Sequence, residues 1–303
     1  MSKIAAVVVT YNRKELLSTC IEKVLGQTQG EPDVLIIDNA STDGTDVMVK
    51  ELAQSNPRIK YMSTGANLGG AGGFSYGINA AVNLGYDYLW IMDDDTFPEE
   101  NALEELIKAS DRLNNDYGFL SSYVKWTDGS SCEMNLPKVS TKWRYFVDME
   151  FEHNMFSLDS ASFVSLFVRT EAVNEVGLPI KEFFIWGDDV EYTLRLSARH
   201  DSFFVYNSQV VHAIKTNIAS SIVDEEDEQR LGRYKLLYRN RYYIARHSSK
   251  RAKFEFWMEV KNNIRDILKK SKGNKWKKCS IVLKSCLAGF FFNPKIDKVH
   301  TTD

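Results

Sequence analysis

The first 95 residues alternate between short apolar runs and amphipathic stretches, and this alternation restricts the possible folds more than any other feature of the chain. The apolar runs are continuous, which is typical of strands covered on both faces, and they lie at 4–10, 34–37, 59–62 and 88–92. The helical stretches between them, which have helical spacing or capping residues, lie at 16–25, 47–53 and 74–84. This β-α-β-α-β-α-β order predicts an α/β fold with a parallel sheet and helices on both faces.

Polar or glycine-rich residues follow each of the four apolar runs. They are TYNR at 10–13, DN at 38–39, NLGG at 67–70 and DDD at 93–95. In open parallel sheets, ligands bind beyond the carboxyl ends of the strands. We therefore expect a nucleotide pocket at that edge. The glycine-rich stretch at 65–73 is predicted to be a loop before a helix, with backbone N–H groups of 69–73 available to phosphate oxygens.

Three adjacent carboxylates at the end of a buried strand repel one another and resist desolvation. Because side chains alternate along an extended chain, Asp93 and Asp95 are expected to point one way and Asp94 the other. Two carboxylates that converge on one point suit Mg²⁺ or Mn²⁺. The alternative is a solvated acidic turn that caps a following helix, with Pro98 in the first turn of that helix.

Composition narrows the class of protein. With 303 residues, 44% of them hydrophobic and 26% charged, the chain is expected to be an ordinary globular protein with a sizeable core. The net charge of -3 gives no argument for nucleic-acid binding. The four cysteines form no C-x-x-C pair and are expected to be reduced thiols. We find neither a secretory signal nor an apolar run of the ~20 residues that a spanning helix needs, so a cytoplasmic location is expected.

The second half of the chain is less regular. Residues 125–155 have no sustained period and are expected to be a loop or small hairpin, and 160–169 is expected to be a strand. An acidic cluster of Asp188, Asp189 and Glu191 opens a helix, and further strand character follows at 203–206 and 210–212. We expect a catalytic domain at 1–222, with halves at 1–97 and 98–222, and a helical, basic region at 223–303.

The basic region allows two interpretations. Lysines between 269 and 278 precede an apolar stretch at 281–292, as in helices that lie on the surface of a membrane. The protein would then be peripheral on the inner face of the cell membrane. Alternatively, this segment packs on the catalytic domain or on a second copy in a homo-oligomer. No nucleic-acid-recognition motif accompanies the charge.

Taken in order, the motifs VVVTYNR, IIDNASTDGT, NLGGAGGF, DDD, WGDDVEYTLR and the later His212 resemble those of the family 2 glycosyltransferases. The resemblance runs from Ile4 to about His212 and is strongest to the galactofuranosyltransferase and rhamnosyltransferase branches. It implies the GT-A nucleotide-sugar-binding fold: a mostly parallel central sheet flanked by helices, here with a C-terminal helical region.

The resemblance also implies roles for individual residues. Asp93, Asp95 and His212 would hold Mn²⁺ or Mg²⁺, and Asp189 would be the catalytic base, with its neighbour Asp188 as the alternative. The residues expected to bind the nucleotide-sugar are Thr10, Tyr11, Arg13, Asp38, Asn67, Gly69, Gly70 and Asp94. Those expected to bind the acceptor are Phe184, Trp186 and Glu191, for which core packing or the stabilisation of a helix N-terminus is the alternative role.

The implied activity is metal-dependent transfer of a sugar with inversion. UDP-galactofuranose and dTDP-rhamnose are the expected donors, and the acceptor is expected to be a lipid-linked saccharide in bacterial cell-surface polysaccharide synthesis. Two other functions are considered. A sugar-1-phosphate nucleotidyltransferase usually carries a glycine-rich signature with an arginine after the first strand, where this chain has TYNR. A non-catalytic nucleotide-sugar-binding module would not need a base such as Asp189.

Overall fold

The computed structural model describes residues 2–218 and 220–299. The chain forms two compact units, and neither is continuous in sequence. The first, here called the sheet unit, contains the chain up to Lys181, Asp189–Asn217 and the segment from Ile296. The second, the helical unit, contains Glu182–Asp188 and Ile218–Lys295. The expected domain division at 222 remains a prediction.

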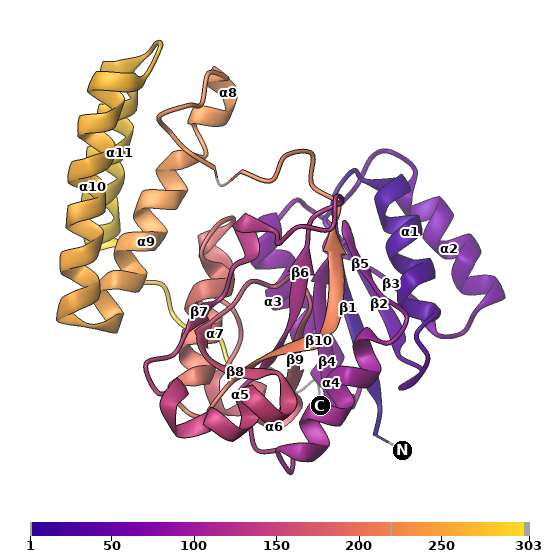
Figure 1. Cartoon of the computed structure of the whole chain (residues 1–303). Helices are drawn as coiled ribbons and strands as arrows, with labels where there is room; N and C mark the ends of the chain where they lie inside the picture. The colour runs from indigo at the N-terminus through magenta and orange to yellow at the C-terminus, as the bar shows by residue number, and fades with distance from the viewer. Residues whose placement is uncertain (1, 219, 300–303) are drawn as a thin grey trace. The chain divides into compact units, whose positions relative to one another are not determined.

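The sheet unit is built on one sheet with the strand order β3-β2-β1-β4-β9-β6-β10-β8-β7, to which β5 adds by pairing with β10 (Figure 1). The strands are β1 Ile4–Thr10, β2 Asp33–Asp38, β3 Ile59–Ser63, β4 Tyr88–Asp93, β5 Thr96–Pro98, β6 Leu120–Lys125, β7 Lys138–Val139, β8 Met155–Ser160, β9 Leu166–Arg169 and β10 Phe203–His212. The first four are parallel, as the sequence predicts. The fold is therefore α/β, with a central sheet flanked by helices.

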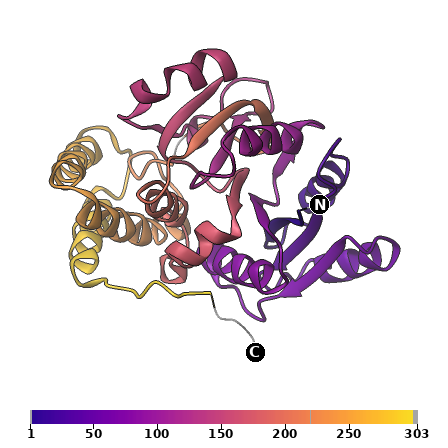
Figure 2. The same cartoon turned by 90° about the horizontal axis from the view of Figure 1, so that it is seen from below.

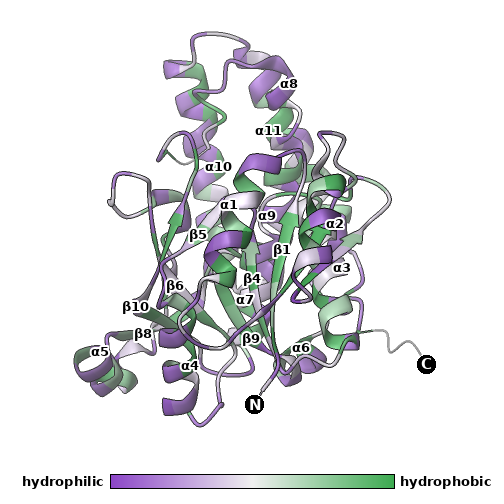
Figure 3. Ribbon diagram, turned by 90° about the vertical axis from the view of Figure 1, so that its right-hand side faces the viewer, coloured by the Kyte–Doolittle hydropathy of each residue, from purple (hydrophilic) through white to green (hydrophobic). Residues whose placement is uncertain are grey.

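Helices cover both faces of this sheet. They are α1 Lys14–Leu25, α2 Thr45–Ser55, α3 Gly69–Asn83, α4 Ala102–Arg112, α5 Val147–His153, α6 Thr170–Val176 and α7 Asp188–Ser197. Alternate residues of β1 enter different cores: Ala6 and Val8 pack with α1 and α4, whereas Val7 and Val9 pack with α3. Figure 3 shows that the central strands are largely hydrophobic, whereas the surrounding helices are amphipathic. A strand buried on both faces explains why its sequence is apolar without alternation.

The later strands are mixed in direction and differ from the sequence prediction. The expected strand at 160–169 is realised only at 166–169, as β9: Ser160 ends the earlier strand β8, and the chain leaves the sheet between them, where Ser165 adopts a left-handed backbone with φ 63°. The two expected short strands at 203–206 and 210–212 are one strand, β10, whose pairing with β6 shifts between Val205 and Gln209. Such a bulge adds residues to one strand without ending it.

Two further expectations at the sheet edge are corrected. Pro98 is not in a helix: it ends the short strand β5, and α4 begins at Ala102. The glycines at 69–73 are not a loop but the first turns of α3. A Cβ on Gly73 would lie 2.6 Å from Val9 Cγ1, and one on Gly77 would lie 2.7 Å from Val7 Cγ1. The glycines therefore let the helix approach the sheet closely.

The irregular region at 125–155 contains short elements. These are a 3₁₀ turn at Glu133–Asn135, β7, a second 3₁₀ turn at Trp143–Phe146, and α5. Strand β7 pairs antiparallel with β8, so the expected small hairpin corresponds to this pairing, although a helix lies between the two strands. The short turns explain why no sustained period is visible in the sequence.

The helical unit contains α8 Glu228–Leu231, α9 Tyr234–Ser248, α10 Lys250–Lys270 and α11 Lys275–Phe291. The three long helices pack against one another in pairs, as the view in Figure 2 shows. Their core includes Leu231, Tyr238, Phe256, Val260 and Val282. Within the residues that the structure describes, no helix has the length and apolarity required to cross a membrane.

Candidate functional site

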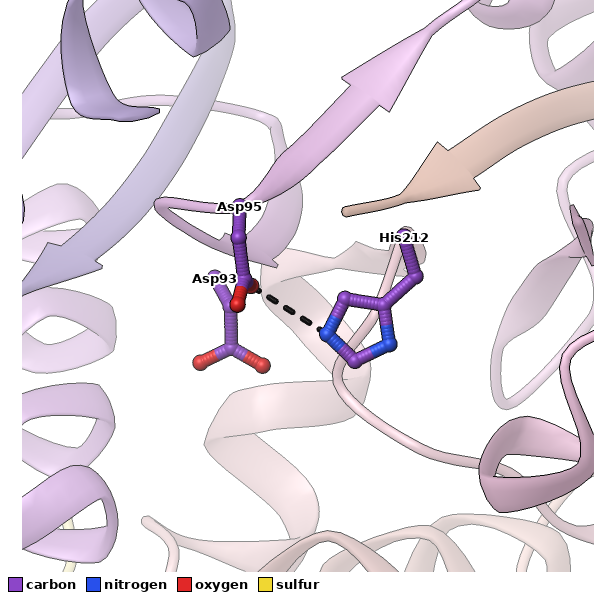
Figure 4. A group of neighbouring side chains, drawn as sticks. All are labelled: Asp93, Asp95 and His212. Carbon is purple, nitrogen blue, oxygen red and sulfur yellow. Dashed lines mark ion pairs between the residues drawn. The ribbon is translucent and has the colours of Figure 1, made fainter. Parts of the chain in front are cut away.

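The acidic residues lie where β4 ends and β5 begins. Asp93 is the last residue of β4, and Asp94 and Asp95 form the turn before β5. This turn, and not an extended strand, places Asp93 and Asp95 on one side together with His212 (Figure 4). One ligand atom from each of these three residues lies within 4.8 Å of the others.

Backbone pairing fixes the position of His212 relative to the acids. In the antiparallel pairing of β10 with β5, His212 is opposite Thr96. The next residue, Ala213, donates its N–H to the carbonyl oxygen of Asp95 at 2.8 Å. The imidazole Nε2 lies 3.2 Å from Asp95 Oδ1. Residues 117 positions apart in sequence are thus held together by main-chain bonds.

The other imidazole nitrogen has its own partner. His212 Nδ1 donates to Asn135 Oδ1 at 2.8 Å, and Cys132 Sγ donates to the same oxygen at 3.0 Å. Asn135 Nδ2 in turn donates to Ser162 Oγ at 2.9 Å. Because Nδ1 carries the proton in this bond, Nε2 is the nitrogen available to bind a cation.

The pKa shifts reflect this crowding. Burial and then the charge of Asp95 raise the pKa of Asp93 to about 7. Burial opposes ionisation of Asp95, but its ion pair with His212 lowers its pKa overall. Burial alone would lower the pKa of His212; instead, its ion pair with Asp95 and its contact with Cys132 raise it to about 10. Without a cation, an imidazolium therefore balances part of the negative charge.

Asp94 points to the first strand. It accepts from Thr10 Oγ1 at 2.7 Å and from Arg13 Nη1 at 3.1 Å, and the same guanidinium lies 2.5 Å from Asp95 Oδ2. Burial raises the pKa of Asp94 to about 6, against the charge of Arg13. The side chain of Arg13 is half exposed. The guanidinium thus neutralises part of the acidic cluster and still reaches the surface.

The donor set fits a hard divalent cation. Asp95 Oδ1 is buried and makes no hydrogen bond with any described residue, although it faces the imidazole. A buried carboxylate oxygen without a hydrogen bond is costly unless an ion takes it as a ligand. Two carboxylates and one imidazole, with the imidazole oriented by a second partner, match the ligands of Mn²⁺ or Mg²⁺.

The other residues expected to bind the donor lie at the carboxyl ends of β1–β3 or at the start of α3. Asp38 is buried and already accepts from the Ser41 N–H at 2.8 Å and from Tyr61 Oη at 2.7 Å. Tyr11 is 43% exposed, which leaves its ring free to stack. Asn67 Oδ1 accepts from the Gly69 N–H at 2.9 Å and so turns the chain into α3.

The first turn of α3 has an open side. A Cβ built on Gly70 has no described atom within 4 Å, in contrast to Gly73. The first backbone N–H groups of a helix have no acceptor within the helix. The start of α3 therefore offers N–H donors beside open space, as a diphosphate would require.

Asp189 lies in the first turn of α7 and is partly buried. Its Oδ1 accepts from the Val190 N–H at 2.7 Å, and burial raises its pKa to about 6. Thr193 fixes this turn, because its hydroxyl donates to the carbonyl oxygen of Asp189 at 2.7 Å and contacts the backbone of Ala161. Asp188, the alternative base, is buried.

The residues expected to bind an acceptor have different surroundings. Both carboxylate oxygens of Glu191 pair with Arg195, at 2.7 and 2.9 Å, and Arg195 also donates to two backbone carbonyls. Trp186 belongs to the helical unit and packs on Tyr234, with ring centroids 5.3 Å apart. Phe184 is 42% exposed.

The segment before α7 is strained and held by one buried side chain. Phe184, Trp186 and Gly187 have φ angles of 63°, 67° and 87°, which bulky residues rarely adopt. Asn240 on α9, which is fully buried, directs Nδ2 to the carbonyl oxygens of Phe183, Ile185 and Trp186 at 2.8–3.1 Å. This amide therefore holds a backbone that the local sequence disfavours.

Sequence reasoning did not identify Asn135, Cys132 or Asn240. The first two lie in the region without a period, and Asn240 lies among arginines and tyrosines at helical spacing. Each acts on the backbone or on another side chain, so no motif reveals it. For Asn240, the available signal was its position: a polar residue at the helical spacing otherwise filled by apolar residues of the same stretch.

Comparison with known proteins places this geometry in a family. The family model described as Glycosyl transferase family 2 matches residues 5–162, just over half of the chain. A galactofuranosyltransferase, GlfT1, from Mycolicibacterium smegmatis is 28% identical over 199 residues, which cover 64% of this chain and 65% of that protein. The glycosyltransferase AglE of Haloferax volcanii is 24% identical over 197 residues, 63% of this chain and 60% of AglE. The matched regions thus span less than two thirds of these relatives.

Solved structures share the fold. GalNAc-T7, crystallised with UDP, GalNAc and Mn²⁺, superposes with a TM-score of 0.65 at 14% identity, covering 94% of this chain and 58% of GalNAc-T7. TarS of S. aureus superposes with a TM-score of 0.56 at 15% identity, covering 96% of this chain and 44% of TarS. The sheet is therefore of the GT-A type. With the sequence match over residues 5–162, these findings establish that the chain belongs to glycosyl transferase family 2.

Proposed function

We propose that the protein is a metal-dependent, inverting glycosyltransferase that transfers galactofuranose from UDP-galactofuranose, or rhamnose from dTDP-rhamnose, to a saccharide acceptor of a bacterial surface polysaccharide. The observation that carries the proposal is the convergence of Asp93, Asp95 and His212 within 4.8 Å at the carboxyl edge of the sheet. Membership of the family and the similarity to galactofuranosyltransferases support galactofuranose as the first choice.

The donor would lie along the carboxyl ends of β1–β4. Tyr11 would stack on the base, and the open first turn of α3 at Gly70 would give N–H donors to the diphosphate. Asp93, Asp95 and His212 would hold Mn²⁺ or Mg²⁺, which supplies Lewis-acid neutralisation of the leaving nucleoside diphosphate. Arg13, already beside the acids, would add a second positive charge there.

The acceptor hydroxyl would be activated by Asp189. In a direct displacement, this hydroxyl attacks the anomeric carbon, its proton passes to the carboxylate, and the bond to the diphosphate oxygen breaks on the opposite face. Configuration therefore inverts. A carboxylate of raised pKa is suited to this role, because it accepts a proton more readily than an ordinary aspartate. We place Phe184 and Trp186 near the acceptor as part of the same proposal.

The acceptor is proposed to be a saccharide on a lipid carrier, so that the enzyme would act at the cytoplasmic surface of the membrane. This part of the proposal draws on the basic C-terminal helices.

A donor panel tests the proposed activity. Binding of UDP-galactofuranose, dTDP-rhamnose and other nucleotide-sugars is measured by calorimetry with Mn²⁺, with Mg²⁺ and after chelation. We expect UDP-galactofuranose to bind tightly only when a divalent ion is present. In Asp95→Asn, addition of the ion should no longer tighten binding. Asp148→Asn, an exposed aspartate on α5, is the matched control. Equal binding of all donors, or full metal-dependent activity in Asp95→Asn, would refute the proposal.

A further inference from the structure

The lysine-rich segment that the sequence suggests as a membrane contact is largely paired within the helical unit. Lys272 lies 3.2 Å from Glu226, Lys277 lies 3.0 Å from Glu228, and Lys270 lies 3.1 Å from Asp266. Lys278 is buried and donates to the Val223 carbonyl oxygen at 2.8 Å. These acids neutralise much of the lysine charge, so this end of the unit is poorly suited to an anionic surface.

The opposite end of the unit has a different character. It is formed by the end of α9, the start of α10 and the end of α11, which lie together in Figure 1. Arg246 at the end of α9 joins them, because its guanidinium donates to the carbonyl oxygens of Phe290 and Phe292 at 2.6 and 2.8 Å. The ring of Tyr242 lies 5.6 Å from that of Trp257 and 6.5 Å from that of Phe290.

Large apolar side chains are exposed at this end. We call it the aromatic end and define it by Phe254, Trp257, Met258, Leu287, Phe290 and Phe291. Phe254 is 66% exposed and Phe291 is 75% exposed. Trp257, Phe290 and Phe291 are linked by ring contacts through Tyr242. Exposed apolar side chains gathered at one end of a unit mark an interaction surface and not ordinary scatter.

Helix packing keeps these side chains outward. Gly289 faces α9, since a Cβ there would lie 2.9 Å from the Arg239 carbonyl oxygen. Residues two positions away, Leu287 and Phe291, are turned by roughly 200° on the helix and point away from α9. On α10, Phe256 is buried, so Phe254 and Met258 point outward by the same geometry. The exposure therefore follows from the packing of the unit's own core.

The charge around the aromatic end is positive. The stretches 246–258 and 284–295 form it, and together they contain six lysines and arginines and one acid, whereas the next acid, Glu259, pairs with Arg241. The basic residues are Arg246, Lys250, Arg251, Lys253, Lys284 and Lys295, and the acid is Glu255. Glu255 pairs with Arg251 at 2.7 Å. Exposed aromatic rings surrounded by unbalanced cations match the chemistry of a bilayer interface with anionic headgroups.

We propose that the aromatic end docks on an anionic lipid bilayer, with its aromatic and aliphatic side chains in the interfacial layer and its lysines on the headgroups. This inference extends the proposed action at a membrane surface. The reason for lipid binding rests on the proposed function, but the binding itself does not, since it requires neither donor nor cation. The lysine-rich end at 269–278 is not the contact.

Sedimentation with vesicles tests the proposal on the full chain without nucleotide-sugar or metal. Wild-type protein is expected to partition onto phosphatidylglycerol-containing vesicles and not onto pure phosphatidylcholine. Phe254→Ser with Phe291→Ser, and separately Lys250→Glu with Lys253→Glu, should each lower the partition coefficient by about tenfold or more. All four side chains are exposed, so unchanged thermal melting is expected in both variants.

Matched controls lie at the other end of the unit. Trp276→Ser, at a residue 82% exposed, and Lys269→Glu should bind vesicles like wild type. The proposal fails if the wild type ignores anionic vesicles, if the aromatic-end variants bind normally, or if the controls lose binding equally. It also fails if light scattering shows a dimer that Phe254→Ser with Phe291→Ser dissociates. A chain that binds vesicles but transfers no sugar would refute only the proposed activity.

Discussion

The two nitrogens of His212 have separate partners, and this leaves Nε2 as the nitrogen for the proposed cation. Nδ1 donates to Asn135, so Nε2 faces Asp95. The pKa of His212 is raised to about 10, and a cation must therefore displace a proton to bind Nε2. The proximity of Asp93, Asp95 and His212 was expected from sequence, because the two acids lie at the end of an apolar run and the resemblance to the family pointed to His212. Asn135 could not be, since only the folded chain places it against the imidazole.

Replacement of Asn135 is predicted to weaken cation binding. Asn135→Ala removes the acceptor that orients His212, and outer-shell changes of this kind cost roughly 10–100-fold in metal affinity. Calorimetry with Mn²⁺ measures the affinity. Titration at pH 7 in buffers of different ionisation enthalpy should show release of more than one proton per ion in the wild type, one from His212 and part of one from Asp93. Asn135→Asp keeps an acceptor oxygen and should restore affinity, and the exposed Asn207→Ala should leave it unchanged. Wild-type affinity in Asn135→Ala would contradict this role.

A second prediction concerns the pH dependence of turnover. Burial raises the pKa of Asp189 from its ordinary value of 3.8 to about 6. A general base acts only when unprotonated, so kcat should be constant above this pKa and fall as pH drops through about 6. Asp189→Asn should lower kcat by about 10²–10⁴-fold and leave donor affinity almost unchanged. If Asp188→Asn is the impaired variant instead, the base has been assigned to the wrong residue.

At the level of elements, the first half of the fold followed from sequence and the second half did so only in part. The strands β1–β4 are continuous apolar runs, and each lies within a residue or two of its predicted position. The division between β8 and β9 was missed, because the backbone turn at Ser165 leaves no mark in hydrophobicity. The start of α3 was placed too late, since glycine disfavours helices in isolation. Close packing on the sheet overrides that preference.

The glycines of α3 give a paired stability test. A Cβ on Gly77 would lie 2.7 Å from both Ile37 Cγ1 and Val7 Cγ1, so Gly77→Ala should lower the free energy of unfolding by about 1–3 kcal/mol. Gly70→Ala places its methyl group in open space and should be neutral or stabilising by up to about 1 kcal/mol. Urea denaturation measures both. Equal effects would show that close helix–sheet packing is not the reason for glycine at position 77.

At the scale of the whole molecule, the chain is not divided in sequence as it is in space. Glu182–Asp188 belongs to the helical unit, although it lies between two segments of the sheet unit. A shift in composition near residue 222 cannot reveal this, because contacts and not local sequence decide which unit a segment joins. The backbone that leads into Asp189 is therefore supported from the C-terminal third of the chain.

Asn240→Ala tests that support. The change removes the side-chain donor to the partly buried carbonyl oxygens of Ile185 and Trp186, whereas the Phe183 carbonyl keeps the Ile185 N–H, and it should lower the free energy of unfolding by about 3 kcal/mol. It should also lower kcat, since this segment precedes Asp189. Asn262→Ala, at an exposed position on α10, is the control. The interpretation is wrong if both variants melt and turn over alike.

The pairing of β10 with β5 has one more consequence. Because main-chain bonds at Thr96 and Ala213 set the spacing between Asp95 and His212, these two proposed cation ligands are preorganised before any ion binds. Ion binding then costs little conformational entropy, because the ligand side chains are already held in position. Replacement of Mn²⁺ by Mg²⁺ should therefore leave the backbone of β5 and β10 unchanged.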